Sequence, residues 1–146
     1  CTGSNKDYRH AKYFEKLMTM LPALEIQGDV HILGNIPRID QIQLMRRSLA
    51  VVQPSLFEGW STVVEDARCL GKVMFLSDLA VHIEQAPAYS TYFDRHDAQS
   101  LVKALMHRLP TLEPGPDLQR EAVCADESVN RTEDFGRAFC NIASDS

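Results

Sequence analysis

Residues 55–71, SLFEGWSTVVEDARCLG, decide the predicted fold of this chain. They lie between two short apolar runs, residues 49–52 and 73–76, each of a length that is typical of a buried parallel strand. Thr62-Val63-Val64-Glu65 has the pattern of a capping box ahead of an apolar stretch, which predicts a helix that starts at Thr62. Gly71 is predicted to end that helix. The stretch therefore predicts a loop and a helix between two buried strands.

The chain before this stretch predicts two helices and two strands, the second strand being the apolar run that precedes residues 55–71. Residues 29–33 predict a short strand that stops at the turn Gly34-Asn35-Ile36-Pro37. Residues 50–53 predict the strand that leads into the central loop. The first helix is predicted between Asp7, as its N-cap, and Pro22. Apolar residues recur at helical spacing along one face of each helix: Tyr13, Phe14, Leu17, Met18 and Leu21 in the first, and Ile39, Ile42, Met45 and Leu49 in the second.

After the central helix, residues 73–76 predict a strand, and residues 79–88 predict a short irregular segment. Tyr92-Phe93 predicts one more brief strand. A helix is predicted from its N-cap Asp97 to Pro110, followed by a surface segment over residues 110–116. A final helix is predicted around residues 132–142, where Phe135, Phe139 and Ile142 share one face.

The alternation of helices with short buried strands predicts right-handed βαβ units. The expected fold class is α/β, a Rossmann-like doubly wound parallel sheet with helices on both faces. Four motifs are absent from the sequence: GxGxxG, GxxxxGK[ST], HExxH and GxSxG. Their absence disfavours a dinucleotide oxidoreductase, a P-loop phosphatase, a zinc protease and an α/β-hydrolase.

The composition limits the class of protein. With 146 residues, of which 45% are hydrophobic, the chain can bury one core of ordinary size. A net charge of -5 disfavours nucleic acid as a partner, and no run approaches the roughly 20 apolar residues of a membrane span. The cysteines Cys1, Cys69, Cys124 and Cys140 show no metal-ligand spacing, so neither disulfide nor metal site is assigned. A soluble protein in a reducing, cytoplasmic compartment is expected.

The loop at residues 58–62 is the predicted ligand site. A loop that contains a glycine between a strand end and a helix start offers free N–H groups, which favour an anion. Glu58 and Glu65 flank this loop, and two carboxylates are better suited to accept hydrogen bonds from hydroxyls than to hold a phosphate. A ligand with hydroxyls on both sides of its phosphates is a nucleotide sugar. The backbone of Gly59, Trp60, Ser61 and Thr62 is predicted to hold the diphosphate, while one glutamate holds the sugar and the other the ribose.

A structural role competes with each of these assignments. Glu65 could serve only the capping box, and Trp60 could pack under the loop rather than line a cleft. Gly34, Asn35 and Ile36 lie at another strand end, where a nucleotide base could rest on the backbone, although a simple turn also explains Asn35. His82 and Glu84 follow the next strand, where an ordering role is favoured over catalysis.

The segment PSLFEGWSTVVEDARCLGK, followed by SD and VHIEQ, resembles the donor-binding motif of glycosyltransferase family 4, whose members are retaining GT-B enzymes. Upstream, HILGNIPRIDQIQLMRRSLAVVQPS is similar to the strand, turn, helix and strand that lead into this motif. The resemblance covers roughly residues 1–109. The matching motif positions are Pro54-Ser55, Glu58-Gly59, Glu65, Ala67 and Gly71-Lys72.

The resemblance implies the C-terminal, donor-binding half of a GT-B enzyme that transfers a sugar from a nucleoside diphosphate with retention and without a metal cofactor. Residues 1–110 would form the nucleotide-sugar-binding domain without its first strand and helix, and residues 111–146 its linker and C-terminal helices. Glu58 takes the catalytic position. The two motif glutamates are usually separated by seven residues, and here by six, so Asp66 competes with Glu65 for the ribose. Glu65 is favoured.

The chain begins at Cys1 without an initiator methionine, so a piece of a longer protein is expected. The resemblance implies an N-terminal acceptor-binding domain as the missing partner. Peripheral association with the inner membrane through that domain is the alternative to a purely cytoplasmic location. We expect this chain to bind donor weakly and not to turn it over. The alternative function is a non-catalytic α/β module that binds a nucleotide or another protein.

Overall fold

The computed structural model describes residues 1–4, 12–85 and 87–144. The chain forms two compact units, Cys1–Ile42 and Gln43–Ser146, and each unit is considered by itself. The predicted division into a domain over residues 1–110 and a linker with C-terminal helices over residues 111–146 remains a prediction.

The first unit contains helix α1 (Tyr13–Ala23) and the beginning of α2 (Arg38–Arg47). Leu21 is the buried residue of α1, in agreement with its place in the predicted apolar stripe. Pro22 lies inside the last turn, so the helix ends one residue later than predicted, because the fixed backbone angle of proline is compatible with helix. The predicted N-cap Asp7 lies outside the described residues.

The predicted strand over residues 29–33 is wrong. The described backbone makes isolated bonds instead: Leu33 N–H donates to Cys1 O over 2.9 Å, and Gly3 N–H donates to Gly34 O over 2.9 Å. Gly3 has a φ of +125°, outside the range of a regular strand. The segment therefore makes isolated backbone bonds and does not form a strand.

The second unit is built on a parallel sheet. Its strands are β1 (Val51–Gln53), β2 (Met74–Ser77) and β3 (Ser90–Phe93), in the order β1-β2-β3. Val52 pairs with Phe75, and Phe75 pairs with Thr91. The predicted strands at residues 50–53, 73–76 and 92–93 are confirmed to within two residues. Parallel strands must be joined by crossover connections, as the alternation of helices and strands in the sequence implied.

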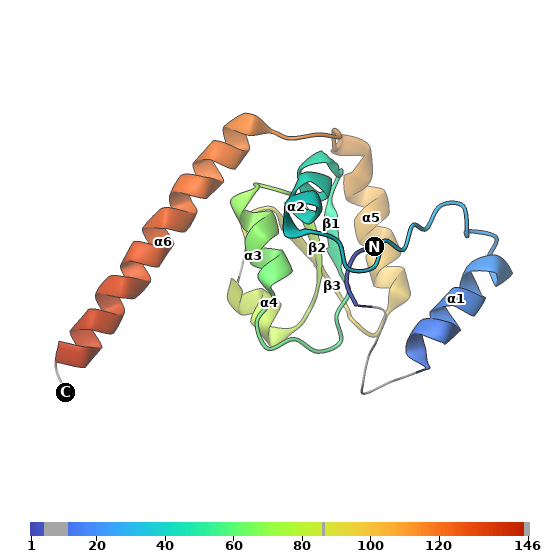
Figure 1. Ribbon diagram of the computed structural model, residues 1–146, viewed down its shortest axis with the longest axis horizontal. Coiled ribbons are helices and arrows are strands. Elements are labelled where there is room, and N and C mark those ends of the chain that lie inside the picture. Colours follow the sequence, from blue (N-terminus) through green and yellow to red (C-terminus); the bar gives the residue numbers. More distant parts are fainter. Residues whose placement is uncertain (5–11, 86, 145–146) are drawn as a thin grey trace. The chain divides into compact units, whose positions relative to one another are not determined.

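The two faces of β2 bury different side chains. Met74 and Leu76 pack with residues of α2 and α3 (Thr62–Cys69), whereas Phe75 packs with α5 (Ala98–Arg108). Figure 1 shows α3 and α5 on opposite sides of the sheet. All four residues of β2 are buried, as expected for a central strand covered on both faces. The predicted α/β sheet with helices on both faces is confirmed.

Helix α3 starts at Thr62, as predicted, and ends at Cys69. Gly71 follows with a φ of +59°, the left-handed conformation that terminates many helices. A Cβ atom at this position would lie 2.7 Å from Cγ of Arg120, which belongs to α6 (Leu118–Ser144). Gly71 therefore ends α3 and also allows α6 to pack closely.

We expect Gly71→Ala to lower the free energy of unfolding by about 1–3 kcal/mol, because alanine is strained at positive φ and its Cβ would contact Arg120. Denaturant unfolding measures this change. Gly136→Ala in α6 is the matched control, since nothing lies within 4 Å of its Cβ position, and it should stabilise by roughly 0.5–1 kcal/mol. Equal effects of the two substitutions would contradict this role of Gly71.

Two further helices differ in their agreement with the predictions. Helix α5 has the predicted N-cap, where the Asp97 carboxylate accepts from Gln99 N–H over 2.8 Å, and it gives way at Leu109 to the short 3₁₀ helix η1 (Leu109–Thr111). The predicted irregular segment over residues 79–88 is wrong, since α4 (Ala80–Gln85) forms there. Gln85 of this short helix is buried and donates to Ser61 O, 24 residues earlier, a long-range contact that no local pattern in the sequence contains.

Helix α6 is much longer than the predicted final helix, because its first half packs on α3. Cys124 is buried, and Cys69 Sγ lies 3.1 Å from Ser128 Oγ. Glu121 forms an ion pair of 3.0 Å with Arg46. The predicted face of Phe135, Phe139 and Ile142 is exposed, with 73%, 64% and 70% of each residue accessible. Among the described residues, no helix is long and apolar enough to cross a membrane.

Candidate functional site

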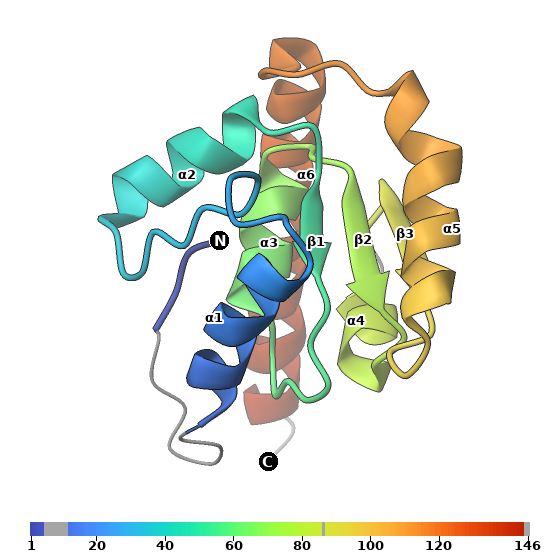
Figure 2. The same cartoon turned by 90° about the vertical axis from the view of Figure 1, so that its right-hand side faces the viewer.

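The loop that joins β1 to α3, residues 54–61, contains most of the predicted ligand site and lies at the edge of the sheet where the parallel strands end. Figure 2 shows this loop and α4 at the arrowhead end of β2. Ligands of open parallel sheets bind outside the carboxyl ends of the strands. Three apolar side chains of the loop are exposed: Leu56, Phe57 and Trp60. The loop therefore offers both backbone and apolar surface at the edge where a ligand is expected.

Glu58 is held by the end of β1. Its Oε1 accepts from Gln53 Nε2 over 2.7 Å and from Ser55 Oγ over 2.8 Å. Both bonds use the same carboxylate oxygen, so within the described part of the chain Oε2 remains available as an acceptor. The side chain is fixed in orientation and half-buried. Such a carboxylate can accept a hydrogen bond from a ligand hydroxyl without reorganising.

A second set of hydrogen bonds fixes the loop to β2 and α4. Ser77 Oγ donates to Ser55 O over 2.7 Å, and His82 Nδ1 lies 2.9 Å from Ser77 O. Because a carbonyl only accepts, Nδ1 carries a proton and donates it to Ser77 O. His82 is 0% exposed, so its side chain is not accessible to a ligand. It orders the loop indirectly, through Ser77. This geometry agrees with the ordering role favoured for His82.

The start of α3 has an uncapped first turn. Ser61 occupies the N-cap position, makes no side-chain cap bond, and is 2% exposed. Within the described part of the chain, its Oγ is buried without a hydrogen-bond partner. Uncapped first-turn N–H groups and the helix dipole favour a bound anion. Gly59, Thr62 and Trp60, which is 54% exposed, surround this helix start, so Trp60 is not packed under the loop.

The predicted capping box at Glu65 is wrong. Since Ser61 rather than Thr62 is the N-cap, Glu65 lies one residue beyond the capping-box position. Its Oε1 accepts from Gln85 Nε2 over 2.7 Å, and its Oε2 lies 3.3 Å from Arg68 Nη1. Gln85 Nε2 also donates to Ser61 O over 3.0 Å. Glu65 is therefore connected to the start of α3 through Gln85. Asp66, its competitor in the sequence, lies half-buried on the same helix.

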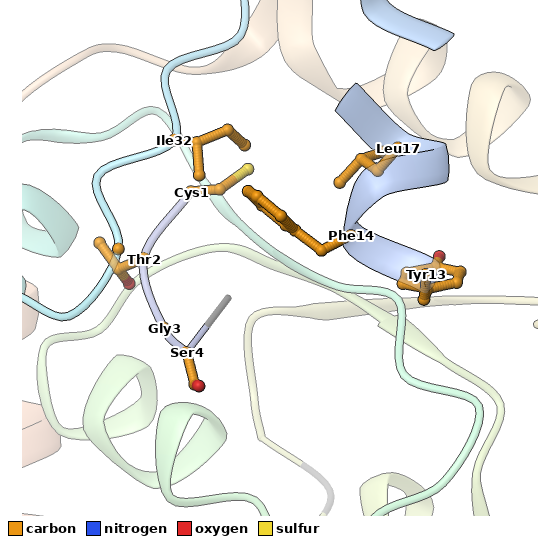
Figure 3. Close-up of a pocket in the computed structure, with 9 residues that line it drawn as sticks. Cys1, Thr2, Gly3, Ser4, Tyr13, Phe14, Leu17 and Ile32 are labelled. Atoms are coloured by element: carbon orange, nitrogen blue, oxygen red, sulfur yellow. The ribbon is translucent and has the colours of Figure 1, made fainter. Parts of the chain in front are cut away.

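Gly34, Asn35 and Ile36 belong to the first unit, whereas Glu58 to Glu65 belong to the second. Gly34 has a φ of +63° and lines a cavity of about 190 Å³ with residues 1–4 and with Phe14 and Leu17 of α1. Figure 3 shows Phe14 and Leu17 pointing toward Cys1 and Ile32. Asn35 and Ile36 are not among the lining residues. Residues 1–4 were not predicted as site residues, although Thr2-Gly3-Ser4 is the kind of small, glycine-containing segment that lets backbone approach a ligand.

Gln85, Arg68 and Arg95 were also missed. Arg95 follows β3, and its Nη1 donates to Asp78 O over 2.9 Å and lies 3.2 Å from Asp78 Oδ1. Asp78 itself follows β2 in the SD motif, so the two side chains join adjacent strand ends. The rule that parallel strands end at one edge would have found Arg95. Nothing in the local pattern pointed to Gln85, whose contacts are 20 and 24 residues away.

Lys72, a motif position of the resemblance, has a structural role. It is 7% exposed, and its Nζ donates to Ser48 O over 2.5 Å and to Gly115 O over 3.3 Å. Burial and the nearby charge of Arg120 lower the pKa of Lys72 from its ordinary value. The ammonium group therefore joins the end of α2 to the segment before α6.

Metal ligands were not predicted for this site. Within residues 1–4, 12–85 and 87–144, no group of three or more His, Cys, Asp or Glu side chains is placed to hold a metal ion. The expectation of metal-free chemistry stays a prediction.

Residues 10–109 match a family model, that of the glycosyl transferases group 1. The match spans more than half of the 146 residues and includes the whole loop, α3, α4 and all three strands. No curated protein matches the chain.

Proposed function

The chain belongs to the group 1 glycosyltransferases, and from that premise we propose that it is the donor-binding part of a retaining glycosyltransferase. The donor is a nucleoside-diphosphate sugar. The family supplies the transferase class, and the arrangement of residues 54–65 supports the more specific roles that follow.

The observation that carries this proposal is the fixed carboxylate of Glu58 beside the uncapped start of α3. Gln53 and Ser55 hold one oxygen of Glu58, while Ser61 leaves the first turn of α3 without a side-chain cap. A carboxylate suits hydroxyls, and an uncapped helix start suits phosphates. A nucleotide sugar carries both groups next to each other.

Each part of the donor has a proposed partner. Glu58 accepts hydrogen bonds from the sugar hydroxyls, and the backbone from Gly59 to Thr62 binds the diphosphate. Glu65 accepts from the ribose, because its side chain keeps 29% exposure and each carboxylate oxygen can accept a further bond. Asp66 is the alternative ribose ligand. Gly34, Asn35 and Ile36 stay the residues proposed for the nucleotide base.

The proposed reaction needs charge stabilisation more than acid–base chemistry. When the sugar leaves, negative charge develops on the diphosphate, and first-turn amides of α3 are aimed where that charge forms. Glu58 is proposed as the catalytic residue because it holds the reacting sugar. No metal cofactor is proposed, because the first-turn amides of α3 are proposed to stabilise the developing charge.

We further propose that an acceptor-binding domain completes this site. The present chain is then expected to bind donor but not to transfer the sugar. Calorimetry with a panel of UDP- and GDP-sugars tests binding, and a steady-state transfer assay tests turnover. Saturable binding of at least one donor without turnover is the expected result. Failure of every donor to bind would contradict the proposed function, and efficient transfer would contradict the need for a second domain.

The competition between Glu65 and Asp66 can be resolved by two substitutions. We expect Glu65→Ala to weaken the binding of the free nucleoside diphosphate and of the whole donor by the same factor, roughly tenfold, because the ribose is common to both ligands. Asp66→Ala should leave both affinities unchanged. Calorimetry measures the four dissociation constants, and the reverse ranking of the two variants would assign the ribose to Asp66.

A further inference from the structure

Helix α4 supplies two buried side chains to the surroundings of the proposed donor site. His82 and Gln85 are three residues apart, so they lie on the same side of this helix, and they are 0% and 5% exposed. His82 holds the loop after β1 through Ser77. Gln85 contacts the other half of the site, at the start of α3. Because Gln85 is too buried to touch a donor, it can affect binding only through the groups that it holds.

The orientation of the Gln85 amide follows from its two partners. Its Nε2 lies 3.0 Å from Ser61 O and 2.7 Å from Glu65 Oε1. A carbonyl oxygen and an ionised carboxylate only accept hydrogen bonds, so the NH2 group of Gln85, and not its oxygen, faces them. Both protons of Nε2 are therefore used. One holds the backbone of the N-cap residue, and the other holds the carboxylate that is proposed for the ribose.

The bond to Ser61 O fixes the direction of the Thr62 amide. The Ser61 carbonyl and the Thr62 N–H belong to one planar trans peptide, in which they point in opposite directions. Ser61 O also accepts from Glu65 N–H in the first turn of α3, but over 3.3 Å, which is longer than the 3.0 Å to Gln85. The shorter bond from Gln85 thus helps to keep the Thr62 N–H pointing out of the helix start, where the diphosphate is proposed to bind.

Arg68 restrains the other oxygen of the Glu65 carboxylate. Its Nη1 lies 3.3 Å from Glu65 Oε2, and its Nη2 donates to Gln85 O. Each of these three residues therefore contacts the other two. With one carboxylate oxygen held by Gln85 and the other by Arg68, the orientation of Glu65 is fixed before a ligand arrives. Groups that are ordered in advance lose less conformational entropy on binding, which strengthens it.

We propose that Gln85 is a positioning residue for donor binding. Through Ser61 O it aims the Thr62 amide at the diphosphate, and through its second proton it orients the Glu65 carboxylate toward the ribose. This role rests on the proposed function, because both routes end at groups that are assigned to the donor. Helix α4 then orders the two halves of the site, with His82 on the side of the β1 loop and Gln85 on the side of α3.

Calorimetry with UDP and GDP tests this role on the whole chain. Gln85→Met keeps the length of the side chain but removes both donated bonds. We expect it to weaken, about tenfold, the binding of the diphosphate that the wild type prefers. Gln99→Met is the matched control, since Gln99 is exposed on α5, and it should leave the affinity unchanged. Circular dichroism checks that both variants are folded.

A double-mutant cycle separates positioning from a general loss of structure. In a Glu65→Ala background the route through the carboxylate is already lost, so Gln85→Met should weaken binding by only about threefold more, through Ser61. A merely structural role would give the same factor in both backgrounds. A factor of about ten in both would therefore contradict the action of Gln85 through Glu65.

The geometry can also be measured in the wild type without a ligand. Nitrogen-15 NMR gives the rates at which side-chain NH2 protons exchange with water. We expect the NH2 protons of Gln85 to exchange roughly tenfold or more slowly than those of Gln99, because they are buried and both are hydrogen-bonded. Equal rates at the two glutamines would overturn the proposal, even if Gln85→Met failed to fold.

Failure of this role and failure of the proposed function give different results. Diphosphate binding by the wild type with an unchanged affinity in Gln85→Met would overturn the positioning role alone. Absence of binding of every donor and of both diphosphates by the wild type would contradict the proposed function, and the positioning role with it.

Discussion

Glu58→Ala is expected to lower the affinity for a nucleotide sugar roughly 10- to 100-fold and to leave the affinity for the free nucleoside diphosphate unchanged. The reason is positional: Gln53 and Ser55 hold one carboxylate oxygen, and the other is available to the sugar hydroxyls. The diphosphate, in contrast, is assigned to the backbone after Glu58. Parallel calorimetric titrations with the donor and the free diphosphate measure the difference.

Two further variants sharpen this test. Glu58→Gln keeps the size of the side chain and an acceptor oxygen for Gln53 and Ser55 but removes the charge, so its effect should lie between wild type and Glu58→Ala. Glu133→Ala removes an exposed carboxylate from α6 and should have no effect. A loss of the same size for donor and diphosphate would show that Glu58 does not contact the sugar.

Phe75→Ala is expected to lower the free energy of unfolding by about 3–5 kcal/mol. Phe75 lies in the central strand, is 0% exposed, and packs with Val73, Phe93 and several half-buried residues of α5. Truncation to alanine would leave a cavity between the sheet and that helix. Urea unfolding followed by circular dichroism measures the change.

Phe135→Ala is the matched control for that substitution. The same atoms are removed from a side chain on α6 that is 73% exposed, so the expected change is within about 0.5 kcal/mol. A loss at Phe135 as large as the loss at Phe75 would mean that the exposed face of α6 is covered in solution.

The parallel sheet could be predicted because the residues that define its strands and the adjoining helix ends are close together in the sequence. Val73 to Leu76 form an uninterrupted apolar run, Gly71 ends the helix before it, and Asp97 caps the helix after β3. Glu58 could be selected for the same reason, since a strand end followed by a glycine is visible in the sequence. Each of these features depends on residues that are close together in the chain.

The features that were missed depend on distant partners. The first half of α6 has a polar sequence, yet it packs on α3, where Cys69 Sγ lies 3.1 Å from Ser128 Oγ, and its Glu121 pairs with Arg46 of α2. Glu65 matched a capping box, but Gln85, 20 residues later, binds its carboxylate instead. No local pattern contains such contacts, and α4 and the role of Gln85 were missed for this reason.

The central claim is that a nucleotide sugar binds at the start of α3, beside Glu58. Amide NMR of the nitrogen-15-labelled chain, titrated with the donor that binds best, tests it most directly. The account predicts that the largest shifts occur at the amides of Gly59, Trp60, Ser61 and Thr62, and that they saturate together. Saturable shifts confined to other residues, with these four amides unmoved, would contradict it.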